Sequence, residues 1–592
     1  MTLTRSGDNP RVSPTAPNTA DDTAGSRPAA MHRLGRHAAL LTLVLLALIP
    51  FVQNGMIGNA DEGAVLTQAR IINQTGGWSM QGDVEVDPDG KWFALDLADH
   101  VGDGWYPYAK HPLFAVVVAG VGTGHLWQLY GLMTLGTVAA AVAAGLLARR
   151  ISPRYGPWAL WCCGIASPLL FDSYWLIAHT LGAAVAGFAV VGALRFLVDR
   201  RGDGLFVCVA GALTAALLRS EGVLFGVALS IACLALVGVG VGRGRRALLG
   251  GATLATTAMA YVGDAAWARR IEPGSAAKPF HIADEQGWLI GRLEGAWNSL
   301  LRPAVITSTG AGLSLVAAVA LVVGACYLRF RPSEPRIARV AVWIGAAAAI
   351  ARLAFAPSPV GGLFTAFPIM VVGLIFLPRS VLANPTARLC ALVAGLHSAA
   401  VLATQYSAGG AGEWGGRFFH IVLPMLVALT VAGLDSMRQF VPPDSWRQIL
   451  RAGAAITVAL AVLAMLTHRG IREAPRRLVD ATVAAAVASD AEAATGAAGG
   501  RTPTPTPVIM TWPAAGRFAW ASVLDRSFFM VDDPADLRTI GARLCHAGHR
   551  SVVLAADPDH ADQLRDLGPY RIDTRHLVDG TGWVVATLTG SC

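Results

Sequence analysis

The sequence predicts an α-helical polytopic membrane protein with about 13 transmembrane helices and a small C-terminal α/β domain. The chain of 592 residues is 54% hydrophobic and only 15% charged, and its mean hydropathy is +0.49. Ordinary globular domains are less apolar and more charged. Apolar runs long enough to cross a bilayer recur between Ala38 and Leu466, and short arginine-bearing loops separate them.

The spans are predicted within residues 38–467. Residues 1–37 are rich in Ser, Thr, Pro, Asp and Ala, which predicts a disordered cytoplasmic tail. No A-x-A-like cleavage site follows the first apolar run, so this run is interpreted as an anchor. The predicted spans are 38–57, 125–148, 156–173, 176–198, 204–219, 222–242, 247–268, 304–327, 338–356, 361–377, 388–405, 418–435 and 449–467.

Arginines predict the orientation of these spans in the plasma membrane. Clusters near the span ends fall on one side if the helices alternate, and the positive-inside rule makes that side the cytoplasm. An odd number of helices then places the C-terminal domain outside. Four arginines after the last span do not fit this orientation, namely Arg469, Arg472, Arg476 and Arg477. The alternative is a helix count that is off by one at the C-terminal end, whereas the earlier clusters determine the orientation of the other spans.

Net charge and cysteines agree with a membrane protein. The net charge of +8 comes mainly from the anchoring arginines, so it gives no reason to expect a nucleic-acid partner. Six cysteines lie inside predicted helices without the spacing of a metal site. Cys545 and Cys592 lie in the tail, and the sequence alone does not decide whether they pair.

The long loop 58–111 contains the strongest candidate site residues. It begins with Asp61-Glu62-Gly63 directly after the first span. Charged side chains are costly in hydrocarbon, so two carboxylates at this position suggest a polar site at the membrane edge. The loop ends with Lys110 and His111, two potential cations for a phosphate. The alternative interpretation is that these residues only anchor the loop.

Two further stretches fall on the same predicted side. One contains Arg219 and Glu221 in a short turn, which could be a hairpin cap or part of a site. The other is a glycine-rich turn with Glu413, Trp414 and Arg417, which could be an ordinary flexible turn. Guanidinium groups bind phosphate oxygens in a bidentate fork. The three stretches together predict a site that binds an anionic lipid headgroup and withdraws a proton from an acceptor.

The chain resembles the bacterial GT-C superfamily of polytopic glycosyltransferases in the order of these features. They are the acidic pair after the first helix, a Lys-His-Pro-Leu segment before the second, His179 at a helix entry, and a late Gly-Gly-x-x-x-Trp-Gly-x-Arg-Phe turn. Relatives in that superfamily include protein mannosyltransferases, aminoarabinose transferases and mycobacterial arabinofuranosyltransferases. The resemblance covers residues 38–467.

This resemblance implies a catalytic base and a donor. Asp61 is the first candidate for the base and Glu62 the second, and the implied donor is a polyprenyl-phosphate sugar. The acceptor would be a hydroxyl of an envelope glycan, lipid or protein on the extracytoplasmic face. The predicted donor-phosphate ligands are Lys110, His111, Arg219 and Arg417, and further site candidates are His179, Glu221, Glu413 and Trp414.

The sequence commits to no cofactor. A divalent metal ion held by Asp61 and Glu62 stays open, although adjacent carboxylates are a thin ligand set. Two other functions also stay open. A lipid-linked glycan flippase would have many spans too, but we find no internal repeat. A non-catalytic envelope-assembly protein would leave the acidic pair unexplained.

The region after the spans is predicted to be a linker, 468–507, followed by the domain 508–592. Thr502–Pro507 alternates threonine and proline, as in stiff linkers. Strands are predicted at 508–512, 528–531, 551–555 and 583–588, and helices at 534–546 and 560–567. No cluster of catalytic type occurs there, so this domain is expected to bind the acceptor glycan or shield the site.

Overall fold

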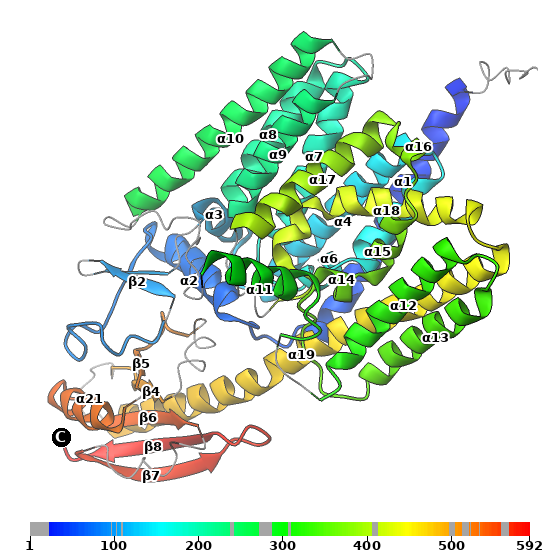
Figure 1. Ribbon diagram of the computed structural model, residues 1–592. Helices are drawn as coiled ribbons and strands as arrows, with labels where there is room; N and C mark the ends of the chain where they lie inside the picture. The colour runs from blue at the N-terminus through cyan, green and yellow to red at the C-terminus, as the bar shows by residue number, and fades with distance from the viewer. Residues whose placement is uncertain are drawn as a thin grey trace, which may run out of the picture.

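The computed structural model of the chain describes residues 23–95, 97–101, 104–107, 111–236, 242–271, 287–305, 309–404, 413–496, 504–511, 520, 522–531, 533–557, 560 and 568–592. They form a helix bundle from which one long helix, α19 (Pro443–Gly496), extends to a small C-terminal sheet (Figure 1). The region that follows the first helix lies between the bundle and this sheet.

The bundle contains helices of very different lengths. In chain order, those described are α1 (Thr23–Val52), α3 (Pro112–Val121), α4 (Leu126–Ile151), α5 (Tyr155–Trp161), α6 (Leu169–Asp172), α7 (His179–Leu197), α8 (Asp203–Leu218), α9 (Ser220–Ala235), α10 (Arg243–Ile271), α11 (Trp288–Leu300), α12 (Gly312–Phe330), α13 (Pro335–Arg352), α14 (Leu363–Ala366), α15 (Pro368–Ile375), α16 (Arg379–Leu382), α17 (Pro385–Thr404) and α18 (Leu423–Ser436). A π-helix, η1 (Cys162–Ala166), and two 3-10 helices, η2 (Arg417–Val422) and η3 (Met437–Gln439), join some of them.

Seven helices in the described part of the chain are long and apolar enough to cross a membrane, by length and composition. They are His32–Val52, Leu126–Ile151, His179–Leu197, Gly312–Phe330, Pro385–Thr404, Arg417–Gln439 and Pro443–Thr495. Helices α3, α8 and α9 are apolar but shorter. The predicted helical membrane architecture is therefore found, whereas the predicted number of about 13 spans is not confirmed.

Two predicted spans are interrupted helices. The region 156–173 consists of α5, η1 and α6, and the region 361–377 consists of α14 and α15. Pro168 precedes α6, and Pro368 is the first residue of α15. Proline has no amide hydrogen and clashes with the preceding turn, so it kinks or interrupts a helix at such positions.

Two predicted boundaries also differ from the structure. Helix α1 begins at Thr23, so the predicted disordered tail 1–37 is wrong for its last part, while residues 1–22 lie outside the described ranges. Helix α19 continues to Gly496, so most of the predicted linker 468–507 is helical. Alanine-rich sequence has high helix propensity, and buried Leu478, Val479 and Ala486 pack this end of α19 against the C-terminal sheet.

Glycines allow close helix packing inside the bundle. A Cβ atom at Gly433 of α18 would lie 1.8 Å from the carbonyl oxygen of Gly373 of α15. A Cβ atom at Gly204 of α8 would lie 2.5 Å from the carbonyl oxygen of Gly192 of α7. Small residues at such crossings let helix backbones touch, which is the usual way that helices associate in a membrane.

The loop between the first two predicted spans is folded. It contains α2 (Ala60–Thr75) and a three-stranded antiparallel sheet in the order β1 (Met80–Gln81), β3 (Gly104–Pro107), β2 (Ala98–Val101). The Asn59 side chain caps α2 by accepting a hydrogen bond from the backbone N–H of Glu62, at 2.8 Å. Gly76 ends the helix in the left-handed conformation, with φ of 70°.

The C-terminal domain is a five-stranded sheet with one described helix, α21 (Pro534–His546). Its strand order is β5 (Phe528–Met530), β4 (Val508–Met510), β6 (Ser551–Ala556), β8 (Val584–Gly590), β7 (Tyr570–Leu577). β4 is parallel to both of its neighbours, and β8 is antiparallel to both of its own. The four predicted strands and the first predicted helix are present. β7 was missed, and the second predicted helix, 560–567, lies outside the described residues except for His560.

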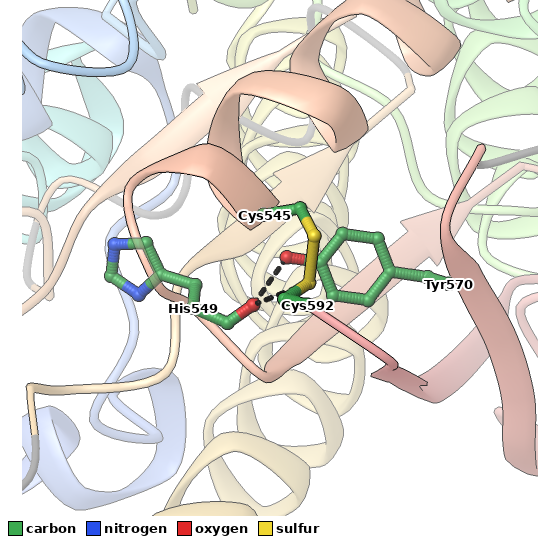
Figure 2. The surroundings of a disulfide bond; sticks show 4 residues. All are labelled: Cys545, His549, Tyr570 and Cys592. Carbon is green, nitrogen blue, oxygen red and sulfur yellow. Dashed lines mark hydrogen bonds between the residues drawn. A yellow bond between two sulfur atoms is a disulfide. The ribbon is translucent and has the colours of Figure 1, made fainter.

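A disulfide joins Cys545 of α21 to Cys592 and so ties the chain end to this domain (Figure 2). The backbone carbonyl oxygen of His549 lies beside the disulfide. It accepts a hydrogen bond from the Tyr570 hydroxyl, and the Cys592 sulfur lies 3.6 Å from it. The pairing that the sequence left undecided is therefore present in the structure.

The C-terminal domain docks on the folded loop. Trp520 packs on Gly63 of α2, where an added Cβ atom would lie 2.4 Å from the indole ring. The Thr67 hydroxyl donates a hydrogen bond of 2.9 Å to the Trp520 carbonyl oxygen. Trp92 of the loop is buried in one hydrophobic cluster with residues of α21 and the sheet. Helix α2, which carries the acidic pair, is thus supported by the end of the chain (Figure 1).

Candidate active site

Asp61 and Glu62 are neighbours in the first turn of α2, but they face different surroundings. The Asp61 side chain is 33% exposed, and its Oδ2 atom lies 3.6 Å from Nη1 of Arg417. The Glu62 side chain is completely buried. Of the two carboxylates, Asp61 is therefore the one that a substrate can reach.

The carboxylate of Glu62 accepts hydrogen bonds from several buried donors. Its Oε1 atom lies 2.7 Å from the backbone nitrogen of Leu176, 3.2 Å from the Tyr130 hydroxyl and 3.4 Å from Nη2 of Arg472. Its Oε2 atom accepts a short hydrogen bond from the backbone N–H of Gly58. Both oxygens of Glu62 are thus occupied by protein donors. This arrangement suits a residue that stabilises the fold better than a second catalytic base.

Arg472 is buried at the centre of this network. Its Nε atom donates to the Met56 carbonyl oxygen at 3.1 Å, and Nη2 donates to the Tyr174 carbonyl oxygen at 2.7 Å. Its Nη1 atom lies 2.7 Å from Nδ1 of His468. The network joins α2, α4 and the α6–α7 connection to α19. It also explains why Arg472 does not follow the positive-inside pattern, since this arginine is an internal ion-pair partner and not a topology anchor.

The glycine-rich turn places a second charged group beside Asp61. Arg417 contacts Oε1 of Glu413 as well as Asp61. The other carboxylate oxygen of Glu413, Oε2, lies 3.2 Å from Nε2 of His179 at the start of α7. The structure thus brings together Asp61, Arg417, Glu413 and His179, four of the predicted site residues. The first part of this turn, residues 409–412, lies outside the described ranges.

A histidine and an aspartate that the sequence analysis did not select lie directly behind this group. The His420 ring packs edge-on against the His179 ring, with 5.2 Å between the ring centroids. Nδ1 of His420 contacts the Asp172 carboxylate, and Nε2 lies 3.0 Å from the Gly415 carbonyl oxygen. His420 is therefore held between two acceptors and fixes the turn that carries Arg417.

Arg219 and Glu221 form a pair between α8 and α9. Nε of Arg219 donates to Oε2 of Glu221 at 3.1 Å, and Nη2 donates to Oε1 at 2.6 Å. The guanidinium fork expected to bind a phosphate is thus occupied by Glu221, and Nη1 has no partner among the described residues. Arg219 lies beside α7, since a Cβ atom at Gly182 would be 3.7 Å from its Cγ atom. Arg219 also lies close enough to Arg417 and Glu413 for their charges to affect its pKa.

The remaining predicted residues have separate positions. Lys110 lies outside the described residues. His111 precedes α3, and its Nδ1 atom lies 3.3 Å from Oδ2 of Asp264 on α10, a partner that the sequence analysis did not select. Trp414 is buried and stacks on Phe171, with 5.3 Å between the ring centroids. Trp414 therefore supports the turn by packing.

The charge of Glu413 is maintained by its neighbours. Burial alone would raise the pKa of this carboxyl group, but the charges of Arg417, His179 and Arg219 lower its pKa below the usual range. Glu413 is therefore ionised at neutral pH and holds Arg417 in place beside Asp61. The accessible carboxylate of Asp61 therefore lies next to the guanidinium group of Arg417, which Glu413 holds in position.

Among the described residues, two groups of side chains could provide ligands for a metal ion. Asp61 and Glu62 do not converge, because the oxygens of Glu62 accept hydrogen bonds from protein donors. Asp172, His179 and His420 offer ligand atoms within 4.8 Å of one another. Both ring nitrogens of His420 face oxygen acceptors, however, so this ring would have to release one of them before it could bind a cation.

Comparisons with known proteins support the fold. No family model matches the sequence, and no curated protein matches it significantly. ArnT from Cupriavidus metallidurans bound to undecaprenyl phosphate is 14% identical, with a TM-score of 0.51 over 95% of this chain and 98% of that chain. The apo form of that ArnT is 13% identical, with a TM-score of 0.50 over 94% of this chain and 98% of that chain.

A third solved structure is the Archaeoglobus fulgidus oligosaccharyltransferase in complex with Zn and sulfate. It is 14% identical, with a TM-score of 0.50 over 89% of this chain and 70% of that chain. At this level of identity the likeness concerns the fold. The chain therefore shares its fold with ArnT and with this oligosaccharyltransferase, and the roles of individual residues stay predictions.

Proposed function

We propose that this protein is a membrane glycosyltransferase of the GT-C type. It moves a sugar from a polyprenyl-phosphate donor to a hydroxyl group of an envelope glycan, lipid or protein on the extracytoplasmic face. The observation that carries this proposal is the environment of Asp61, which is partly exposed and lies beside Arg417, whereas Glu62, Glu221 and Glu413 are buried.

Asp61 acts as the general base. A hydroxyl group is a poor nucleophile at neutral pH, and a positioned carboxylate that takes its proton accelerates attack by about a hundredfold or more. The acceptor oxygen forms a bond to the anomeric carbon of the donor sugar. The bond from that carbon to the phosphate oxygen breaks, its electron pair stays on the lipid phosphate, and the acceptor proton moves to Asp61.

Arg417 and Arg219 stabilise the leaving phosphate. Negative charge develops on the lipid phosphate as its bond to the sugar breaks, and fixed positive charges in a site shielded from water stabilise it. Glu413 orients Arg417, and Arg219 has one guanidinium nitrogen, Nη1, that is not used by Glu221. ArnT was solved with undecaprenyl phosphate, which supports a lipid-phosphate donor for this chain.

The extracytoplasmic location of the site is part of the proposal. The arginine clusters of the sequence favour this orientation. The disulfide between Cys545 and Cys592 favours it as well, because disulfides persist in oxidising compartments and are rare in the cytosol. The C-terminal domain and the loop pack together, so they lie on the same side of the membrane.

The alternative function is a lipid-linked glycan flippase. It would make no glycosidic bond and would only move an intact lipid-linked sugar across the bilayer. The partly exposed Asp61 beside Arg417 favours transfer chemistry, because a flippase has no need for a base at the membrane edge. A non-catalytic assembly protein has no need for it either.

The test uses the purified full-length protein in liposomes with labelled polyprenyl-phosphate sugars and an envelope glycan acceptor. We expect labelled glycoside to form, and we expect Asp61→Asn to lower the rate at least about a hundredfold. Asp444→Asn is the matched control, because Asp444 is 76% exposed on α19 and pairs only with a surface arginine in the described structure. This control should retain full activity.

Two results would contradict the proposal. Normal turnover by Asp61→Asn would remove Asp61 from the role of base. A complete lack of glycoside with several donors, while labelled lipid still crosses the bilayer, would instead support the flippase.

A further inference from the structure

A cavity lies between the folded loop and the C-terminal domain, away from the charged groups described above. Its volume is about 560 Å³, which is within the range of sites that bind small molecules or short polymers. The end of α2 and the β1 region form one wall, and the segment before and within β5 forms the other. Neither wall alone would enclose this space.

We infer that this cavity binds an uncharged, hydroxyl-rich oligosaccharide, namely an inner segment of the acceptor glycan. This inference rests on the proposed function and specifies its acceptor class. Four properties of the cavity support it, namely its hydrogen-bonding capacity, its charge, its rigidity and its distance from Asp61.

The cavity offers polar groups suited to hydroxyl ligands. Gln74 and Gln81 line it and are exposed, and their side-chain amides make no hydrogen bond within the described part of the chain. An amide group can donate to one hydroxyl and accept from another. The Ser79 side chain lines the same wall. Such neutral groups match a ligand that carries many hydroxyls and no charge.

The charge of the lining disfavours an anionic ligand. Asp83, Asp87 and Asp525 line the cavity together with one cation, Arg526, and Asp525 pairs with Arg70 at 3.4 Å. The guanidinium group of Arg526 is directed to Asp490, at 3.4 Å, and to the carbonyl oxygen of Thr506, at 3.2 Å. Carboxylates in excess would repel a phosphate, so this cavity differs in its chemistry from the arginine-containing site beside Asp61.

Hydrogen bonds and aromatic packing keep the cavity open and in shape. The Ser527 hydroxyl donates to Oδ2 of Asp83 at 3.0 Å and so joins the two walls. The Trp105 ring stacks with the rings of Phe93 and His100, at centroid distances of 3.8 and 4.6 Å. A wall of this kind loses little conformational entropy when a ligand binds.

The position on α2 determines the length of the ligand. Gln74 follows Asp61 by 13 residues, which corresponds to about 20 Å along a helix with a rise of 1.5 Å per residue. A single sugar cannot contact both groups. An acceptor whose terminal hydroxyl is at Asp61 and whose inner units are in the cavity must therefore be an extended chain of several sugars.

The experiment measures binding separately from catalysis. Neutral envelope oligosaccharides of graded length, labelled with a fluorophore, are titrated against the full-length Asp61→Asn protein in detergent micelles. We expect affinity to increase with length and the double variant Gln74→Ala/Gln81→Ala to weaken binding of the long chains about tenfold, as the loss of two hydrogen bonds predicts. Gln439→Ala, an exposed residue far along the chain in η3, is the matched control.

Turnover provides the second measurement. In a protein with Asp61 intact, the double variant should raise KM for long acceptors and leave kcat unchanged. Binding of acidic glycans or of basic peptides in preference to neutral oligosaccharides would overturn the inference. Binding of neutral oligosaccharides with an affinity that does not depend on Gln74 and Gln81 would overturn it as well. Binding without any transfer would retain the cavity inference and contradict only the proposed enzymatic function. The thermal stability of the double variant is measured as a control, and an unchanged value would show that the fold is intact.

Discussion

Glu62→Gln tests whether the two neighbouring carboxylates have different roles. The substitution preserves size and leaves one oxygen to accept from Leu176, Tyr130 and Arg472. The other oxygen becomes an NH2 group that faces the backbone N–H of Gly58, so two donors oppose each other. The charge that balances Arg472 is also removed.

The expected magnitude follows from these contacts. A buried donor that loses its acceptor costs about 1–3 kcal/mol. Removal of one partner from a buried ion pair costs about 3–5 kcal/mol in total, because the other charge stays buried. Both side chains are at most 1% exposed, so water does not compensate. We therefore expect Glu62→Gln to lower the free energy of unfolding by about 3–5 kcal/mol.

Asp61→Asn is the control for this prediction. Asp61 is 33% exposed and has a contact of 3.6 Å with Arg417, so the loss of its charge should change the free energy of unfolding by less than about 1 kcal/mol. The two variants differ by one position in the same turn of α2. One should lose stability, and the other should lose activity.

The assay is unfolding of the purified protein in mixed micelles by increasing SDS, followed by tryptophan fluorescence. The double variant Glu62→Gln/Arg472→Met should lose less stability than the sum of the two single variants, since neither charge remains unpaired. A loss below about 1 kcal/mol for Glu62→Gln, or strict additivity with Arg472→Met, would refute the interpretation of Glu62 as the centre of a buried network.

Four further predictions concern other residues. Arg417→Lys should raise KM for the polyprenyl-phosphate sugar more than KM for the acceptor, because lysine lacks the planar guanidinium fork that binds phosphate oxygens in a bidentate way. Equal changes in both constants would contradict this. The pKa of Glu413 is lower in the folded protein than in the unfolded chain. The ionised Glu413 should therefore stabilise the folded protein above about pH 4.5, and this contribution should be lost as the pH falls below that value. Glu413→Gln should remove this pH dependence. Gly63→Ala should force Trp520 to move and destabilise the docked domain by about 1–3 kcal/mol. Protease should then release this domain faster, and an unchanged rate of release would count against the contact. Cys545→Ser should make the end of the chain sensitive to carboxypeptidase, which is measured by mass spectrometry against the oxidised parent.

The sequence predicted the membrane class and singled out Asp61 as the candidate base, because both depend on local signals. Long apolar runs identify spans by composition alone. Asp61 could be selected because it directly follows such a run. The strands and the helix 534–546 of the C-terminal domain could be found by their periodicity. β7 could not, because its residues are mostly exposed and lack an apolar repeat.

The partners of the site residues could not be predicted, because they come from distant parts of the chain. Arg472 had the appearance of a topology signal, whereas in the structure it pairs with Glu62, which precedes it by 410 residues. Asp172 and His420 lie inside apolar segments, and their separation of 248 residues leaves no local pattern. Polar residues within predicted spans were the available signal, since they usually face a partner.

The docking of Trp520 on Gly63 has a consequence for protein synthesis. The hydrogen bond between Thr67 and the Trp520 carbonyl group joins positions 453 residues apart. Helix α2 is therefore translated long before the residues that cover it, and its docking side stays uncovered until the ribosome has almost finished the chain. A product truncated before residue 520 would contain Asp61, Arg417 and every other proposed catalytic group, yet it would lack this support. We expect such incomplete chains to be inserted in the membrane without transferase activity, so that a prematurely terminated protein does not consume lipid-linked sugar.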